Sequence, residues 1–251
     1  MRARHVFRSL CFLAAFLLCF TKASSQDTLA LKANGQVWLD FYPHFYLTPN
    51  LQFYGDAGFR TLVTDAQWVR IHGRPSVRYH INNTLVAHGG IGLFLEFNRD
   101  QGTRFEVRPW QGIQVKWPTF DKLRFSHIIR TEERFNHLFE TDETQFEFRL
   151  RARVGGNFQF DPNRDTGSFF VPFSVELFWP VTNSVDELFS NRTRITMGLG
   201  MNASPTLQFR LIGVWQGSRQ GRQDSFAISD WIVRLQCRYS LDRTVDDDDL
   251  Q

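Results

Sequence analysis

The sequence lacks several features that stabilise exported proteins or anchor them in membranes. Its three cysteines are Cys11, Cys19 and Cys237, too few for a disulfide framework. Beyond the first 25 residues no run is long and apolar enough for a membrane-spanning helix, and no segment shows a helical period. Charge is also missing, but only from alternate positions of extended segments, and this absence is the most informative one.

The segment 146–154 shows this absence most clearly. Apolar Phe146, Phe148, Leu150, Ala152 and Val154 alternate with charged Glu147, Arg149, Arg151 and Arg153. Because successive side chains of a β-strand point to opposite faces, one face is wholly apolar and the other wholly charged. A closed barrel in lipid needs this pattern, with apolar residues outside and polar residues inside.

The same alternation recurs on eleven segments separated by turn signals such as Asn82-Asn83 and Asp161-Pro162-Asn163. The segments are 36–47, 50–62, 66–81, 85–98, 104–117, 122–134, 145–154, 168–179, 191–202, 206–216 and 225–239. They predict an all-β fold, a closed antiparallel transmembrane β-barrel of about ten to twelve strands over 26–241. Because bacterial barrels have even strand numbers, one strand is expected to be missed or falsely assigned, and 28–33 is a candidate.

Two terminal segments are expected to lie outside this barrel. Residues 1–25 read as a signal peptide, in which three arginines precede the apolar run Leu10–Phe20 and the small residues of 23–25. Residues 242–251 form an acidic tail that is expected to be disordered. Removing the leader leaves Cys237 as the single cysteine.

The charges divide by face. Seventeen cations fall on the non-apolar face: Arg60, Arg70, Arg74, Arg78, Arg108, Lys116, Arg124, Arg130, Arg134, Arg149, Arg151, Arg153, Arg192, Arg194, Arg210, Arg234 and Arg238. Eight acids share it, which leaves an excess of nine positive charges: Asp40, Asp56, Glu96, Glu106, Glu132, Glu147, Glu176 and Asp230. The apolar face holds only Glu133, near the end of its predicted strand. The chain without its leader is close to neutral, so no nucleic-acid partner is expected.

Aromatic residues end several apolar faces, among them Trp117, Trp179, Trp215 and Tyr239. Trp and Tyr favour the membrane–water interface, so these residues would form the two girdles of an outer-membrane barrel. The alternative is a soluble, periplasmic β-barrel that binds a ligand and keeps these aromatics in its core.

Pro75, Pro109 and Pro172 fall inside predicted strands and are expected at bulges or at the membrane rim.

One turn can be assigned a register. A two-residue loop at 82–83 would pair His80 with Leu85 and mix the two faces. A three-residue loop, 82–84, pairs Ile81 with Leu85 and keeps apolar residues together. The same register places His88 opposite Arg78.

Several segments occur in a characteristic order along the chain: Tyr54 to Arg60, Glu106 to Gly112, Arg130 to Phe135, Arg149 to Arg153, and Glu187 to Arg192 followed by Gly198 to Gly200. This series resembles the outer-membrane proteins of domain of unknown function family 2490. The resemblance covers nearly the whole chain after the leader. It implies an outer-membrane barrel of Gram-negative bacteria and implies no activity.

The densest group of charges lies on two neighbouring predicted strands. It comprises Arg130, Glu132, Arg134, Glu147, Arg149, Arg151 and Arg153, with Arg124 further away. Antiparallel neighbours bring such side chains within reach across the ladder. The group is either a mutually neutralising network that fills the barrel interior or a cationic constriction that attracts anions.

Other polar groups are candidates for enzyme, metal or ligand sites. His72, Ser76, His80 and His88 share a polar face, but residues four apart on a strand lie ~13 Å apart, too far for a Ser–His pair or a metal site. Trp38, Tyr42, His44 and Tyr46 share a face that either stacks on a ligand or packs the interior. We therefore expect no catalytic residue, no metal and no cofactor.

These observations favour an outer-membrane barrel that acts as a narrow anion-favouring pore or as a structural envelope protein. The alternatives are a lipid-modifying outer-membrane enzyme and the soluble ligand-binding barrel. The expected partners are outer-membrane lipid and the barrel-insertion machinery, and the chain is expected to be a monomer.

Overall fold

The structure is a computed structural model that describes residues 34–63, 68–99, 102–161, 166–182, 191–219 and 227–241. The predicted signal peptide, the candidate strand 28–33 and the acidic tail lie outside these residues. Among the described residues, no helix is long and apolar enough to cross a membrane.

The described chain folds into strands alone. They are β1 (Asn34–Thr48), β2 (Leu51–Tyr54), β3 (Asp56–Leu62), β4 (Trp68–Arg74), β5 (Ser76–His80), β6 (Leu85–Asn98), β7 (Gly102–Lys116), β8 (Leu123–Leu138), β9 (Glu143–Gln159), β10 (Phe169–Pro180), β11 (Asn191–Asn202), β12 (Leu207–Arg219) and β13 (Ala227–Ser240). Each of the eleven predicted segments corresponds to one of these strands or to two consecutive ones.

Two pairs of short strands each make one barrel strand. β2 and β3 are interrupted only at Gly55, and β4 and β5 only at Pro75. The β2–β5 and β3–β4 ladders keep the same register on either side of the interruption, from Leu51 opposite Tyr79 to Asp56 opposite Arg74. Pro75 interrupts the local pairing because it has no N–H donor. It does not lie at a bulge, one of the two places expected for it, because the register is unchanged.

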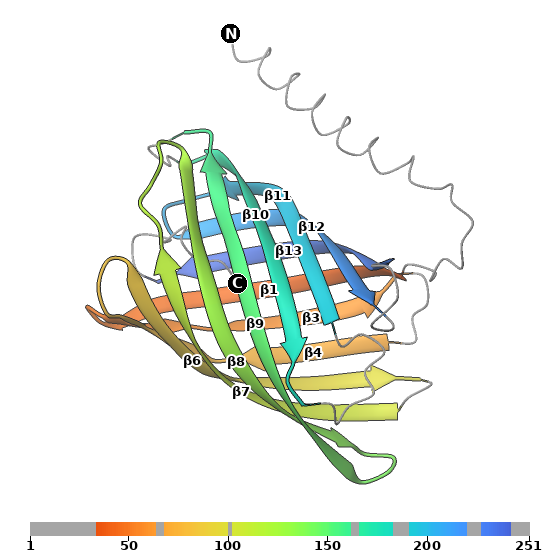
Figure 1. Ribbon diagram of the computed structural model, residues 1–251. Helices are drawn as coiled ribbons and strands as arrows, with labels where there is room; N and C mark the ends of the chain where they lie inside the picture. Colours follow the sequence, from red (N-terminus) through yellow and green to blue (C-terminus); the bar gives the residue numbers. More distant parts are fainter. Residues whose placement is uncertain are drawn as a thin grey trace. The chain divides into compact units, whose positions relative to one another are not determined.

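The barrel strands pair with their neighbours in chain order, and β13 returns to pair with β1 (Figure 1). The β13–β1 pair is parallel, whereas all other pairs are antiparallel. In an up-and-down barrel the first and last strands run the same way when the strand number is odd. The predicted closed all-β barrel of ten to twelve strands is confirmed, with eleven. The expectation of a missed or false strand is wrong for the described residues, because the sheet closes with eleven.

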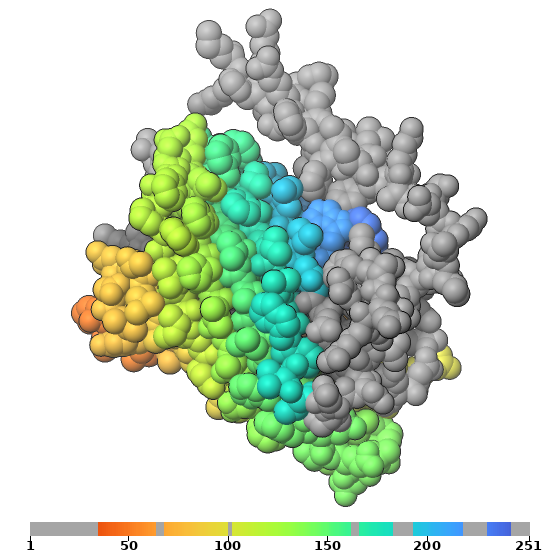
Figure 2. Space-filling view, viewed as in Figure 1, coloured from red at the N-terminus to blue at the C-terminus, as the bar shows by residue number. Residues whose placement is uncertain are grey.

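Burial alternates along the strands as the two-face pattern predicts. On β13 the even positions from Asp230 to Ser240 are buried, while the odd positions include exposed Val233 and Leu235. In Figure 2 the side chains of β7 to β10 form one continuous outer surface on this side of the barrel. Polar residues thus line the interior and apolar residues cover the outside.

The hairpin formed by β8 and β9 is longer than predicted. β8 continues to Leu138 and β9 runs from Glu143 to Gln159, joined by a short turn in which Asp142 adopts a positive φ of 53°. Asp tolerates this left-handed conformation better than most residues. Glu133 is therefore not near a strand end, as the sequence had indicated, but well inside β8.

Candidate functional site

The seven predicted interior residues all lie buried on the inner side of β8 and β9. The ladder places Arg130 opposite Arg151, Glu132 opposite Arg149 and Arg134 opposite Glu147. Because opposing residues share a face, this register gathers the charges of both strands into one cluster.

Glu132 is the centre of the cluster. Its carboxylate lies 2.7 Å from Arg130 Nη2, accepts hydrogen bonds from Arg149, with Nε at 2.9 Å, and lies 3.3 Å from Arg151 Nη1. Arg108 on β7 approaches it at 3.6 Å. Glu132 is fully buried, so its negative charge offsets the repulsion among four guanidinium groups that have little contact with water.

Two further carboxylates extend the network beyond the predicted set. Glu106 on β7 accepts hydrogen bonds from Arg70 at 2.9 Å and from Arg134 at 2.8 Å, and it also pairs with Arg108. Glu176 on β10 pairs with Arg151 and lies 3.2 Å from Arg194. The sequence placed Glu106 and Glu176 on the correct face, but only the register across β7–β10 shows that they bridge arginines of different strands.

Arg153 lies on the same face but outside the ion-pair network. It lies directly opposite Glu176, whose oxygens are engaged by Arg151 and Arg194. The Nε and Nη2 atoms of Arg153 are buried and have no hydrogen-bond partner within the described part of the chain. Arg124 lies further along β8, opposite Asn157, and is also separate from the cluster.

Aromatic side chains fill much of the remaining interior. Seven of them are almost completely buried: Trp38, Tyr42, Tyr54, Phe94, Trp110, Phe170 and Phe178. Guanidinium groups stack on several of these rings, including Arg78 at 3.4 Å from the Tyr54 centroid and Arg60 at 3.9 Å from the Trp38 centroid. Trp38, Tyr42 and His44 are therefore packed against neighbouring side chains, and cation–π contacts add to the stability of this packing.

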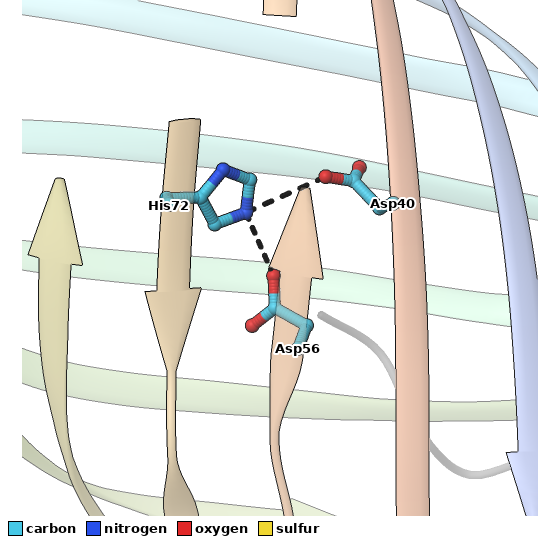
Figure 3. Close-up of side chains that lie close together, drawn as sticks. All are labelled: Asp40, Asp56 and His72. Carbon is cyan, nitrogen blue, oxygen red and sulfur yellow. Dashed lines mark hydrogen bonds and ion pairs between the residues drawn. The ribbon is translucent and has the colours of Figure 1, made fainter. Parts of the chain in front are cut away.

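A second cluster, not recognised in the sequence, joins β1, β3 and β4 (Figure 3). Asp40 lies opposite Gly58, and Gly58 lies opposite His72, so the three residues form one row across the strands. A Cβ atom on Gly58 would lie 2.2 Å from Asp40 Oδ1 and 2.5 Å from the His72 ring. The missing side chain lets His72 Nε2 reach to 3.5 Å from Asp40 Oδ1 and 3.0 Å from Asp56 Oδ2.

The ligand atoms of Asp40, Asp56 and His72 lie within 4.8 Å of one another, a spacing that could hold a metal ion. Both carboxylates, however, already have cationic partners. Arg234 Nε donates to Asp40 Oδ2 at 2.5 Å, and Arg74 donates to Asp56 through Nε at 2.8 Å and Nη2 at 2.7 Å. A divalent cation would have to compete with these arginines, so the cluster fits an internal salt-bridge chain better than a metal centre.

The candidate catalytic residues Ser76 and His88 each have another hydrogen-bond partner. Ser76 donates a hydrogen bond to the Tyr54 carbonyl, and His88 Nε2 lies 2.9 Å from Gln114 Oε1. His88 lies opposite Arg78, as the register of the 82–84 turn predicted, and Ile81 N bonds to the Leu85 carbonyl at 3.0 Å. The His80 ring lies near Tyr46, with the ring centroids 5.9 Å apart.

Comparisons with known proteins give a family match and similarities to solved structures. The family model described as "Protein of unknown function (DUF2490)" matches residues 35–244. No curated protein matches the chain. Among solved structures, the NanC porin is similar with a TM-score of 0.42 at 12% identity, over 72% of this chain and 89% of the porin chain.

Proposed function

The chain belongs to the family described as Protein of unknown function (DUF2490), and this family supplies no role. From the residues of the barrel interior, we propose that the protein is an outer-membrane β-barrel whose Arg-rich lumen favours anions. The observation that carries this proposal is an asymmetry of exposure. The side chains of Arg70 and Arg194 are 15% and 16% exposed, whereas that of Glu132 is 0% exposed. The direct partners of these two arginines, Glu106 and Glu176, are each 3% exposed, so the accessible surface of both ion pairs is mainly cationic.

The outer surface supports the membrane location. Large apolar side chains such as Ile129, Leu211 and Val233 are half exposed and point outward from strands around the barrel. Contiguous apolar surface of this extent is unfavourable in water and favourable in lipid. An exposed apolar belt with a charged interior is the reverse of the arrangement that a soluble ligand-binding barrel needs.

The interior also holds more positive charge than its carboxylates neutralise. Among the residues that the structure describes, Arg153 has no ion-pair partner, and Arg60, which stacks on Trp38, has a buried Nε without a hydrogen-bond partner. A ring of charge of one sign selects ions of the opposite sign at a constriction. Anions are therefore the species that this interior attracts, and the role requires no catalysis.

The test is planar-bilayer conductance of the refolded protein under a salt gradient, which gives the reversal potential. We expect channels that prefer chloride, and a weaker preference in Arg153→Gln. The matched control is Arg153→Lys, which keeps the charge and should keep the selectivity. Cation-selective channels, or an Arg153→Gln variant indistinguishable from the parent, would contradict the proposal.

The buried aromatic rings favour a second candidate, a closed structural barrel of the envelope. Side chains that point into an open channel would be exposed to water, but the inward-pointing Tyr54 and Phe170 are fully buried. Neighbouring side chains therefore close the interior at these two levels. Absence of conductance from a barrel shown to be folded and inserted would favour this role. Opening by Phe170→Ala would then identify the ring as part of the closure.

A further inference from the structure

A polar patch on the outer face is formed by Gln111 on β7 and by Thr131 and Glu133 on β8. Gln111 lies directly opposite Thr131 in the ladder, and Gln111 Nε2 donates a hydrogen bond to Glu133 Oε1 at 3.1 Å. Glu133 is the one charged side chain that points outward from the strands whose side chains the structure describes. The residues around the patch are apolar.

This patch lies within the apolar belt and not at its rim. Along the outer face of β8, Glu133 is six residues from His127, which accepts a hydrogen bond from the girdle residue Trp117, and four residues from His137. With a rise of ~3.3 Å and a tilt of ~40°, these separations correspond to ~15 Å and ~10 Å of height. The height between the two histidines is thus about the ~25 Å of the apolar band of an outer-membrane barrel, and the patch lies inside this band.

The patch retains unused hydrogen-bonding capacity. The hydrogen bond from Gln111 to Glu133 is the one contact of its kind that the described structure gives these two side chains, and the Thr131 hydroxyl has none. A Gln amide has two N–H donors, and a carboxylate has several acceptor sites. In lipid, no water satisfies the remaining groups, so the patch is costly unless another molecule covers it.

A neighbouring glycine leaves room for such a molecule. Gly89 on β6 lies opposite Gln111, and a Cβ atom there would have no neighbour closer than the Trp110 carbonyl at 3.9 Å. Small residues at lipid-facing contacts let two chains approach closely. The notch at Gly89 and the polar groups beside it are two independent features of one surface.

We propose that this patch is the contact between two copies of the barrel in the membrane. The patch contains both donors and acceptors, so it is complementary to itself, as a twofold contact requires. The second N–H of Gln111 would donate to Glu133 of the other copy, and the reciprocal bond would close a ring of four hydrogen bonds. A purely acidic patch would instead repel its own copy. The inference replaces the expected monomer with a dimer and rests on the proposed membrane location.

The experiment is site-specific photo-crosslinking of the full chain in cell membranes. The photoreactive residue p-benzoylphenylalanine is incorporated at position 131 in one protein and at position 211, on the outer face of distant β12, in another. Mass spectrometry identifies the adducts. We expect a product with the mass of two chains from position 131, and lipid adducts alone from position 211.

The dimer product should be lost when Gln111→Leu and Glu133→Leu are combined with the probe at position 131. Lipid adducts from position 211 in the same double variant show that the barrel still folds and inserts. Lipid or a different protein at position 131, with lipid at position 211, would overturn the dimer while leaving the membrane location intact. Absence of lipid adducts at both positions would overturn the membrane location and the dimer with it.

Discussion

Arg153 and Glu176 lie directly opposite each other in the β9–β10 ladder, yet they form no ion pair. Glu176 instead pairs with Arg151, which lies two residues before Arg153 on β9, and with Arg194 on β11. Cross-strand opposition alone therefore does not decide which arginine is neutralised, because Arg194 also lies opposite Glu176 and does pair with it. The assignment depends on how many guanidinium groups compete for each buried carboxylate.

This competition predicts unequal costs for two neighbouring arginines. Arg153→Gln removes a buried charge that has no partner among the described residues. It should lower the free energy of unfolding by no more than ~1 kcal/mol and could raise it. Arg151→Gln removes the contacts to Glu132 and Glu176 and should lower it by ~2–4 kcal/mol. Urea unfolding of both proteins in detergent micelles measures the difference. Equal destabilisation would show that Arg153 is neutralised in the folded protein.

A second pair of adjacent residues tests the two faces of β8. Glu132 points inward among four arginines, while Glu133 points outward. Glu132→Gln leaves those cations without their shared anion and should cost ~3–5 kcal/mol of unfolding free energy. Glu133→Gln keeps a hydrogen-bonding group outside and should stay within ~1 kcal/mol of the parent. A reversed order in the same unfolding assay would mean that the faces are assigned wrongly.

Much of this architecture could be predicted from the sequence because a strand has a strict period of two. The alternation of Phe146 to Val154 gives the face of each side chain without knowledge of its neighbours. The 82–84 turn gave a correct register because only one loop length keeps apolar residues on one face. Local rules therefore predicted the strands, the burial and the charged interior.

Contacts between strands that are distant in the sequence could not be predicted in the same way. Predicting the row of Asp40, Gly58 and His72 requires the exact registers of both the β1–β3 and the β3–β4 ladders. A shift of two residues in either register would keep every side chain on its face but would separate the three residues. The hydrogen bonds of Glu106 on β7 with Arg70 on β4 and Arg134 on β8 depend in the same way on the registers between these strands. The eleven predicted segments imply a parallel closure, but the even strand numbers of bacterial barrels indicated instead that one strand was missed or falsely assigned.

The row at Gly58 leads to a steric prediction. Gly58→Ala would place a Cβ atom 2.2 Å from Asp40 Oδ1 and 2.8 Å from the Leu39 carbonyl, so the Asp40–His72 contact must open. Overpacking of this kind should cost ~1–3 kcal/mol. Gly73→Ala, on the outer face of β4 with nothing within 4 Å, is the matched control and should be tolerated. Thermal unfolding of the two variants distinguishes them, and similar midpoints would argue against the row.

The odd strand number makes a prediction about closure. Leu39 on β1 lies opposite Leu235 on β13, whereas Leu211 on β12 lies one strand further away in the same row. Adjacent strands lie ~4.8 Å apart, within disulfide range, but second neighbours lie ~10 Å apart. In a chain carrying Cys11→Ser, Cys19→Ser and Cys237→Ser, oxidation should join Leu39→Cys to Leu235→Cys and should leave Leu39→Cys with Leu211→Cys unjoined.

Gel mobility before and after reduction reads out this disulfide in the folded, membrane-inserted protein. A twelfth strand between β1 and β13 would move Leu39 and Leu235 to second neighbours, and neither cysteine pair would then form a bond. Since direct pairing of β1 with β13 also positions Arg234 beside Asp40 at 2.5 Å, the same failure would remove the basis for the salt-bridge chain at His72. Formation of the Leu39–Leu235 disulfide alone is the outcome that an eleven-stranded barrel with a parallel closure requires.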